Sequence, residues 1–214
     1  MNIQPPVNLL THQVSQWFGE NLEKTKKFYE MLGIDGHNGL DFACPVGTPI
    51  AAVFTGKVKI YNTVSGGNSI LLYGDGFRAF YCHLESFICR DGEVVQAGET
   101  IATSGNTGAY TTGPHLHFGL YETNKNDVVL NKSNGYDGAI DPVPYLARKF
   151  EDGTLVKTIS EPKVYLIQNG VKWWVKDEKT FEKWFGYKVS KAKIEDISLI
   201  TYKNYKYGEI RFVV

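Results

Sequence analysis

The chain has 214 residues, and its 23 Lys and Arg balance its 23 Asp and Glu, so the formal net charge is zero. This balance argues against nucleic acid or an anionic membrane surface as the main partner. No stretch approaches the roughly 20 apolar residues that a membrane-spanning helix needs, and residues 1–6 lack the basic start and apolar run of a secretory signal. We therefore expect no nucleic acid binding and no membrane insertion, and a monomer is favoured. The three cysteines are odd in number and form no CxxC pair, which favours buried thiols over a disulfide framework.

Residues 1–36 are expected to form an N-terminal helical segment. Asn21 is a candidate N-cap, and Gly33 is a candidate stop signal. Between them, Leu22, Phe28 and Leu32 are the expected apolar positions. The predicted helix leads directly into His37.

Residues 37–150 are expected to form the main domain. From Phe42 to about Leu120 the chain has short runs of Val, Ile, Phe and Tyr separated by glycine-bearing turns, which is typical of β-strands. The Gly-Asp-Gly turn at 74–76 joins the runs 69–73 and 77–81 at hairpin distance, so these are expected to be antiparallel neighbours. The pattern predicts a mainly β fold with an antiparallel sheet.

Residues 151–214 are expected to form a small C-terminal α+β module. Runs 163–167 and 171–175 flank an Asn169-Gly170 turn, the strongest hairpin signal in the chain, and Asp177 is placed to cap a short helix that follows. Trp173 and Trp174 are adjacent on the second run, so one ring should face outward if the other is buried. An outward ring suits a targeting or binding role; packing against the main domain is the alternative.

Four of the five histidines lie in three short motifs, which together suggest one metal site. A catalytic zinc ion takes three protein ligands and leaves a fourth position for water. His37 and Asp41 could supply two ligands, because Gly39 between them gives the backbone freedom to turn. The spacing H-x-x-x-D also occurs by chance, so this motif is weak alone. The motifs are His37-Asn-Gly-Leu-Asp41, Tyr81-Cys-His83-Leu84 and Gly113-Pro-His115-Leu-His117-Phe118.

Strand alternation predicts the directions in which the side chains of the other motif histidines point. His115 and His117 are two residues apart, so on a strand both point to one face, although two ordinary polar residues would do the same. His83 ends a strand-like run, and alternation turns it away from Cys82 and Leu84; alone it would more often be a hydrogen-bonded strand histidine. His12 belongs to no motif and is expected to have a structural or surface role.

The ordered motifs, with Ser104-Gly-Asn-Thr-Gly108 and Thr112-Gly-Pro114, resemble the lysostaphin-like, or LytM-type, zinc endopeptidases. The resemblance runs from about Val14 to Tyr121. It implies the duplicated hybrid motif fold, zinc as the cofactor, and hydrolysis of peptide stems or cross-bridges of bacterial peptidoglycan by a zinc-activated water. It also assigns roles: zinc ligands His37, Asp41 and His117, and an unligated catalytic pair, His83 and His115.

The resemblance leaves some positions open. Tyr29 lies close to where similar proteins carry an oxyanion-stabilising tyrosine, but it could simply pack on its helix. Gly119 offers no side chain where many relatives carry a polar one. Tyr110 and Asn106 are expected to line the substrate cleft, and the loop 65–68 is expected near it.

The implied site of action is the cell wall, in an extracellular or periplasmic space. Because no export signal is visible, we expect a phage-encoded or virion-associated lysin, or a trimmed chain. The alternatives are a non-catalytic LytM-type regulator or a cell-wall-binding protein, against which the complete set of five residues weighs. A lipoyl-type carrier domain would need a lysine at the turn 105–108, and there is none.

Overall fold

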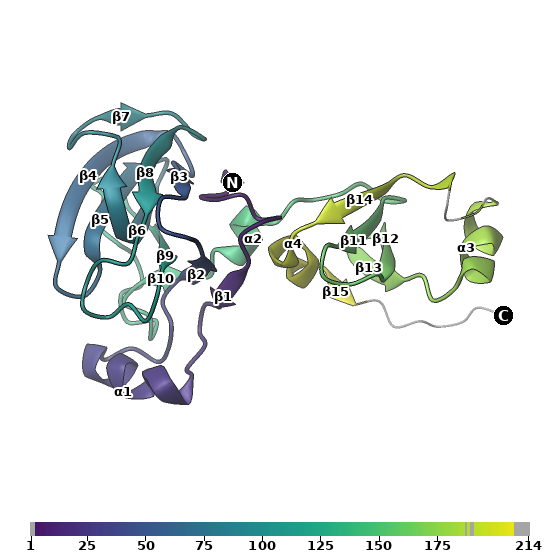
Figure 1. Ribbon diagram of the computed structural model, residues 1–214, viewed down its shortest axis with the longest axis horizontal. Helices are drawn as coiled ribbons and strands as arrows, with labels where there is room; N and C mark the ends of the chain where they lie inside the picture. Colours follow the sequence, from purple (N-terminus) through teal and green to yellow (C-terminus); the bar gives the residue numbers. More distant parts are fainter. Residues whose placement is uncertain (1–2, 187, 189–190, 208–214) are drawn as a thin grey trace. The chain divides into compact units, whose positions relative to one another are not determined.

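The computed structural model describes residues 3–186, 188 and 191–207, and the chain divides into two compact units between Leu146 and Ala147 (Figure 1). The first unit holds the N-terminal helix as well as the large sheet. The expected domain limits, after residues 36 and 150, stay predictions. None of the described helices is long and apolar enough to cross a membrane.

The first unit is built on one large sheet whose strands pair antiparallel throughout, which confirms the mainly β fold. The main path runs β1-β2-β9-β6-β5-β4-β7, while β10 pairs with β9, and β8 joins β3 to β6. The elements are β1 (Val14–Gln16), α1 (Glu23–Leu32), β2 (Leu40–Ala43), β3 (Pro49–Ala51), β4 (Gly56–Thr63), β5 (Gly67–Gly74), β6 (Phe77–Phe87), β7 (Val94–Val95), β8 (Thr100–Ser104), β9 (His115–Glu122), β10 (Ala139–Ile140) and α2 (Val143–Leu146).

The hairpin β5–β6 shows how the sequence sets the two faces of this sheet. Asp75 and Gly76 have φ of 54° and 77°, the left-handed conformations that a tight hairpin turn needs, so the predicted turn is confirmed. Ile70 and Leu72 are fully buried in the core, whereas Leu71 and Tyr73 are half-buried on the other face. One face therefore packs the core and the other remains available for a site.

The N-cap of helix α1 differs from the predicted residue, whereas the residue that ends the helix agrees with the prediction. Asn21 is not the cap, because its side-chain amide donates to the Asp35 carbonyl at 2.8 Å and Leu22 occupies the N-cap position. Gly33 ends the helix with a φ of 67°, as expected. Leu22 and Leu32 are exposed, and the residue that α1 buries is Tyr29.

The second unit contains a five-stranded sheet in the order β14-β11-β12-β13-β15. Asn169 and Gly170 have positive φ, and β12 and β13 pair antiparallel, so the predicted hairpin is confirmed. Neither Trp173 nor Trp174 faces fully outward, since both rings are half-buried. The elements are β11 (Leu155–Thr158), β12 (Val164–Gln168), β13 (Val171–Trp174), α3 (Glu178–Phe185), β14 (Ile194–Ile197), α4 (Leu199–Asn204) and β15 (Lys206–Tyr207).

The three cysteines, Cys44, Cys82 and Cys89, are buried free thiols, as expected from their number and spacing. Burial raises the pKa of the Cys44 thiol to about 11. The stability of the first unit therefore comes from its packed sheet, without a disulfide.

Candidate active site

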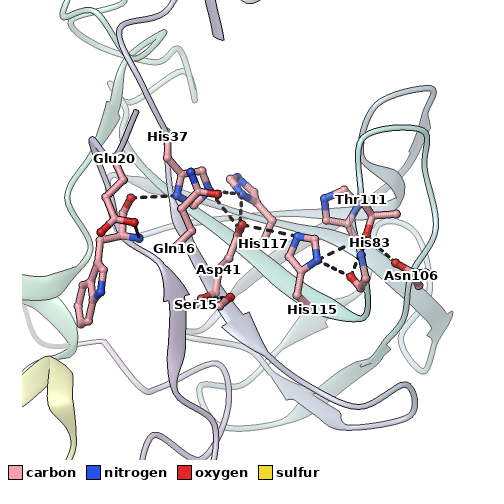
Figure 2. A network of polar contacts seen from close by, with 12 residues as sticks. Ser15, Gln16, Glu20, His37, Asp41, His83, Asn106, Thr111, His115 and His117 are labelled. Atoms are coloured by element: carbon pink, nitrogen blue, oxygen red, sulfur yellow. Dashed lines mark hydrogen bonds and ion pairs between the residues drawn. The ribbon is translucent and has the colours of Figure 1, made fainter. Parts of the chain in front are cut away.

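Sheet register brings the residues of the first and third histidine motifs together. Asp41 on β2 and His117 on β9 are direct partners across the antiparallel pair, so their side chains stand on the same face. His37 reaches the same point from the loop before β2. His37 Nε2 lies 3.0 Å from His117 Nδ1 and 3.1 Å from Asp41 Oδ1, and His117 Nδ1 lies 3.0 Å from the same oxygen (Figure 2). The three atoms form a nearly equilateral triangle.

The hydrogen bonding of His37 makes this triangle a cation site. His37 Nδ1 lies 3.1 Å from the Trp17 carbonyl, which can only accept, so Nδ1 carries the proton and Nε2 of the neutral ring presents a lone pair. The nearest neighbours of that lone pair are another imidazole nitrogen and a carboxylate oxygen. Among the described residues, these three form the group with the geometry to hold a metal ion.

Zinc fits this donor set. Two imidazoles and one carboxylate are typical zinc ligands, and an open fourth position is typical of catalytic sites. Tetrahedral bonds of about 2.0–2.1 Å place ligand atoms about 3.3 Å apart, close to the 3.0–3.1 Å edges observed here.

Gly39 contributes to the site for a different reason from the one expected. Its φ is not positive, so no unusual backbone conformation explains it. A Cβ at this position would lie 2.6 Å from the Phe118 carbonyl oxygen and 2.8 Å from His117 Cε1. Gly39 is therefore needed because the imidazole of His117 packs directly against its backbone. At Gly119, the space beside the missing side chain is occupied by the Tyr121 ring, 3.1 Å from an ideal Cβ.

A second imidazole pair, His83 and His115, stands beside the triangle. Their ring centroids are 4.5 Å apart, and His115 Nε2 lies 3.7 Å from Asp41 Oδ2. Each Nδ1 donates to a backbone carbonyl, His83 to Thr107 at 2.8 Å and His115 to Gly113 at 2.8 Å. Both rings thus keep Nε2 as a free proton acceptor when neutral.

The backbone at His83 corrects the expected strand alternation. His83 lies inside β6 with a φ of 61°, at an irregularity where the register shifts between Asn68 and Ile70 of β5. Cys82 is in register with His117, and it lines the same cleft as His83. The expectation that Cys82 and His83 point to opposite faces is wrong, because the bulge breaks the period of two. A non-glycine residue in this region costs about 1–3 kcal/mol, and such strain is often found at functional sites.

Burial and charge set the ionisation of the cluster. Burial alone would raise the pKa of Asp41, but the contacts with His117 and His37 outweigh it and hold that pKa far below its usual range. Burial lowers the pKa of His83 to about 4, against the opposing effect of its hydrogen bond to Thr107. Burial also lowers the pKa of His117, although Asp41 opposes this. At neutral pH the cluster therefore presents a carboxylate and neutral His83 and His117.

The five residues border a cleft of about 180 Å³, which also contains Tyr29. The Tyr29 hydroxyl accepts a hydrogen bond from the Gln16 amide at 2.7 Å, and burial raises its pKa. Phe28 and Tyr110 meet across the cleft with ring centroids 4.5 Å apart. Tyr110 lines the cleft as expected, and so do Ser65 and Gly66 of the loop 65–68.

The remaining predicted positions are indirect or distant. Asn106 is not part of the cleft wall; its side-chain oxygen accepts from Thr111, which lies against the His115 ring. His12 bonds to its neighbours Thr11 and Asn8, as expected for a structural residue. Sequence reasoning missed Gln16 and the carbonyl groups that orient the rings, since nothing in their residue types marks them.

Comparison with known proteins agrees with this geometry. The sequence profile described as Peptidase family M23 matches residues 35–131, which include every histidine of the cluster. A crystal structure of the lysostaphin catalytic domain from Staphylococcus simulans is 32% identical; the match covers 64% of this chain and 93% of that one, with a TM-score of 0.51. The structure of LytU is 36% identical over 63% of this chain and 83% of that one, with a TM-score of 0.50.

The chain belongs to peptidase family M23. Lysostaphin from Staphylococcus simulans is 37% identical over an alignment 171 residues long, which covers 70% of this chain and 34% of that protein. A zinc containing peptidase from Vibrio cholerae is 25% identical over 71% of this chain and 41% of that one, with a TM-score of 0.52, in accord with zinc as the cofactor. The chain spans about a third of the length of the first curated relatives it matches.

Proposed function

We propose that this protein is a zinc endopeptidase that hydrolyses peptide cross-links of bacterial peptidoglycan. The observation that carries the proposal is the triangle of two imidazole nitrogens and one carboxylate oxygen, with two further imidazoles beside it in one cleft. Such a site combines a place for a Lewis acid with groups that transfer protons.

In this proposal His37, Asp41 and His117 hold the zinc ion. When bound, zinc supplies Lewis acidity, which polarises a carbonyl group and makes water a stronger acid. Trp17 supports this arrangement, because its carbonyl fixes the tautomer and the direction of the His37 ring. Gly39 leaves the room that His117 needs.

His115 and His83 move the protons. His115 Nε2 lies nearer the ligand triangle, 3.7 Å from Asp41 Oδ2, so it is placed to accept a proton from the attacking water. His83 stands next to it and can receive that proton from His115 on its free Nε2. Because burial lowers the pKa of His83 to about 4, the protonated ring gives the proton up readily, so the proton lost by the water passes to the departing amine and both imidazoles end neutral.

Tyr29 is proposed to stabilise the oxyanion. Because the Gln16 amide donates to the Tyr29 oxygen, the hydroxyl proton of Tyr29 is not used in that bond. The Thr25 side chain is its other hydrogen-bond neighbour, and in this proposal the hydroxyl turns its proton to the oxyanion when substrate is bound. A donor aimed at a developing oxyanion stabilises the transition state more than the substrate.

The names of the relatives support a peptidoglycan substrate. They include a glycyl-glycine endopeptidase, ALE-1 from Staphylococcus capitis, 40% identical over 121 residues, which are 54% of this chain and 31% of that protein. They also include ShyB, a peptidoglycan DD-endopeptidase from Vibrio cholerae, 35% identical over 123 residues, which are 56% of this chain and 28% of that protein. We propose peptide stems or cross-bridges as the substrate, cut in the wall outside the cytoplasmic membrane.

The test is digestion of cross-linked peptidoglycan by the zinc-loaded protein. We expect new free amines, with product masses that locate the cleaved bond, and no release by Asp41→Asn, which lacks one ligand charge. Zinc-loaded protein that binds the wall but releases no amine from walls of either glycine-bridged or directly cross-linked type would contradict the proposal and favour a regulator.

A further inference from the structure

A second cavity, of about 650 Å³, adjoins the catalytic cleft. Leu32, Asn38 and Phe80 line both spaces, so one continues into the other. Its floor comes from β4, β5, β6 and β9, which are neighbours in the sheet (Figure 1). The floor carries one cationic side chain, the half-buried Arg78.

Sheet register places Arg78 in line with the metal ligands. On β6 the residues Cys82, Phe80 and Arg78 face His117, Gly119 and Tyr121 of β9 in turn. Alternation puts all six on one face of the sheet. Tyr121 lies four residue steps beyond His117 on β9, which at about 3.3 Å per residue is about 13 Å. An extended peptide on this face would reach Arg78 about four residues from the bond being cut.

Arg78 is oriented but has no anionic partner. No ion pair joins it to a carboxylate among residues 3–186, 188 and 191–207. Its Nε atom is buried without a hydrogen-bond partner in that part of the chain. The guanidinium lies 4.2 Å from the centroid of the Tyr121 ring, and Tyr73 is its register partner on β5. A planar guanidinium that is held against an aromatic ring can bind a carboxylate at low entropic cost, because its orientation is already restricted.

Two other charged residues line the cavity, and neither neutralises Arg78. Lys132 and Asp137 both lie at exposed positions, where solvent screens their charges. Their charges cancel, so the lining has the net positive charge of Arg78.

We propose that Arg78 binds a carboxylate of the substrate peptide, about four residues from the cleaved bond. The inference rests on the proposed function, because it takes the occupant of the cavity to be the peptide that enters the cleft. The carboxylate is either an acidic side chain or the free C-terminus of a stem. This contact would make the enzyme select acidic peptides over their amidated counterparts.

The experiment compares matched glycine-rich octapeptides on zinc-loaded protein. One set carries Glu or Gln at each position in turn, and a second set ends in a free carboxylate or an amide. Binding is measured by calorimetry and hydrolysis by mass spectrometry. For wild type we expect about tenfold tighter binding of the acidic member, greatest when the acid lies three to five residues from the cleaved bond. The set that shows the preference identifies the source of the carboxylate.

The variants separate this contact from general charge. The acid preference is the ratio of the affinity for the Glu peptide to the affinity for the matched Gln peptide. Arg78→Gln is expected to reduce this ratio to about one, while its affinity for the Gln peptides changes less than twofold. Lys132→Gln removes the same charge from the exposed wall of the cavity, and it should keep most of the preference. If Arg78→Gln does not fold, Arg78→Lys keeps the charge without the planar guanidinium, and it should lose most of the preference.

Equal binding of acidic and neutral peptides by wild type at every position, or a preference that survives in Arg78→Gln and Arg78→Lys, would overturn the inference. Because binding is measured separately, a protein that prefers acidic peptides but cleaves none would contradict the proposed function and leave the Arg78 contact supported.

Discussion

Replacing Gly39 by Ala should remove most of the zinc affinity without unfolding the protein. The backbone of Gly39 suits an alanine, since its φ is not positive. The new Cβ would lie 2.6 Å from the Phe118 carbonyl oxygen, 2.8 Å from His117 Cε1 and 3.0 Å from His117 Nε2. Comfortable contacts between carbon atoms are about 3.5–4.0 Å, so either the imidazole or the strand must move by roughly 0.5–1 Å.

A movement of that size is large for a metal site. Ligand distances must hold within about 0.2 Å of their ideal values, and the Phe118 carbonyl belongs to the β2–β9 pair that carries both Asp41 and His117. We expect zinc affinity to fall at least 10- to 100-fold, the range seen when the support of a ligand is disturbed. That loss corresponds to about 1.4–2.8 kcal/mol.

Competition with a chromophoric chelator measures this affinity, and thermal unfolding with and without zinc checks the fold. Gly119→Ala is the matched control. There the added Cβ would meet the Tyr121 ring at 3.1 Å, and the end of a side chain moves more easily than backbone. Its zinc affinity should stay within about threefold of wild type. A folded Gly39→Ala protein that binds zinc as tightly as wild type would refute the reasoning.

Four further predictions test the other parts of the site. His83→Asn should relieve backbone strain at a φ of 61°, which asparagine tolerates, and lower hydrolysis about 10²- to 10⁴-fold while zinc binding in a chelator titration is kept; equal activity would exclude His83 from proton transfer. Because folding lowers the pKa of His83 from 6.5 to about 4, its contribution to stability is present above pH 6.5 and is lost as the pH falls toward 4. The metal-free wild type should therefore lose up to about 3 kcal/mol more than His83→Asn over that range, measured by urea unfolding; parallel curves for the two proteins would contradict this. Tyr29→Phe should lower kcat about 10- to 100-fold in steady-state assays and leave the zinc affinity unchanged. An unchanged kcat would show that Tyr29 only packs against its neighbours. Removing zinc should lower the unfolding free energy by about 2.7 kcal/mol relative to protein held at a free zinc concentration of 100 Kd, and calorimetry that shows no shift would contradict metal binding at this site.

The parts of the fold that local rules control were predictable. Alternation and turn residues predicted the β5–β6 and β12–β13 hairpins, because Asp75-Gly76 and Asn169-Gly170 favour the left-handed conformations that these turns need. The start of α1 was not predictable in this way. Asn21 has the chemistry of a cap, but its amide is used to bind the Asp35 carbonyl, a partner that only the folded chain places beside it.

The site also has features that the sequence could predict and features that depend on the folded chain. That His37, Asp41 and His117 meet was implied by the resemblance to the LytM-type zinc endopeptidases, and their meeting point depends on the β2–β9 register that the structure supplies. The placement of His83 could not be derived from alternation, because a bulge breaks the period of two at that residue. The carbonyls of Trp17, Thr107 and Gly113, which select the tautomers, carry no sequence signal, since every residue has a carbonyl.

These carbonyls explain which nitrogen each histidine of the cluster presents to the cleft. His37, His83 and His115 have Nδ1 bound to backbone, so all three act through Nε2, while His117 meets the triangle through Nδ1. The strand that carries His115 and His117 puts both rings on one face, and the loop carbonyl of Gly113 turns only the first ring to Nε2. Backbone groups held by the sheet and its loops thus set which nitrogen of each ring faces the cleft, which is why a change at a glycine or a bulge should alter the chemistry as strongly as a change at a histidine.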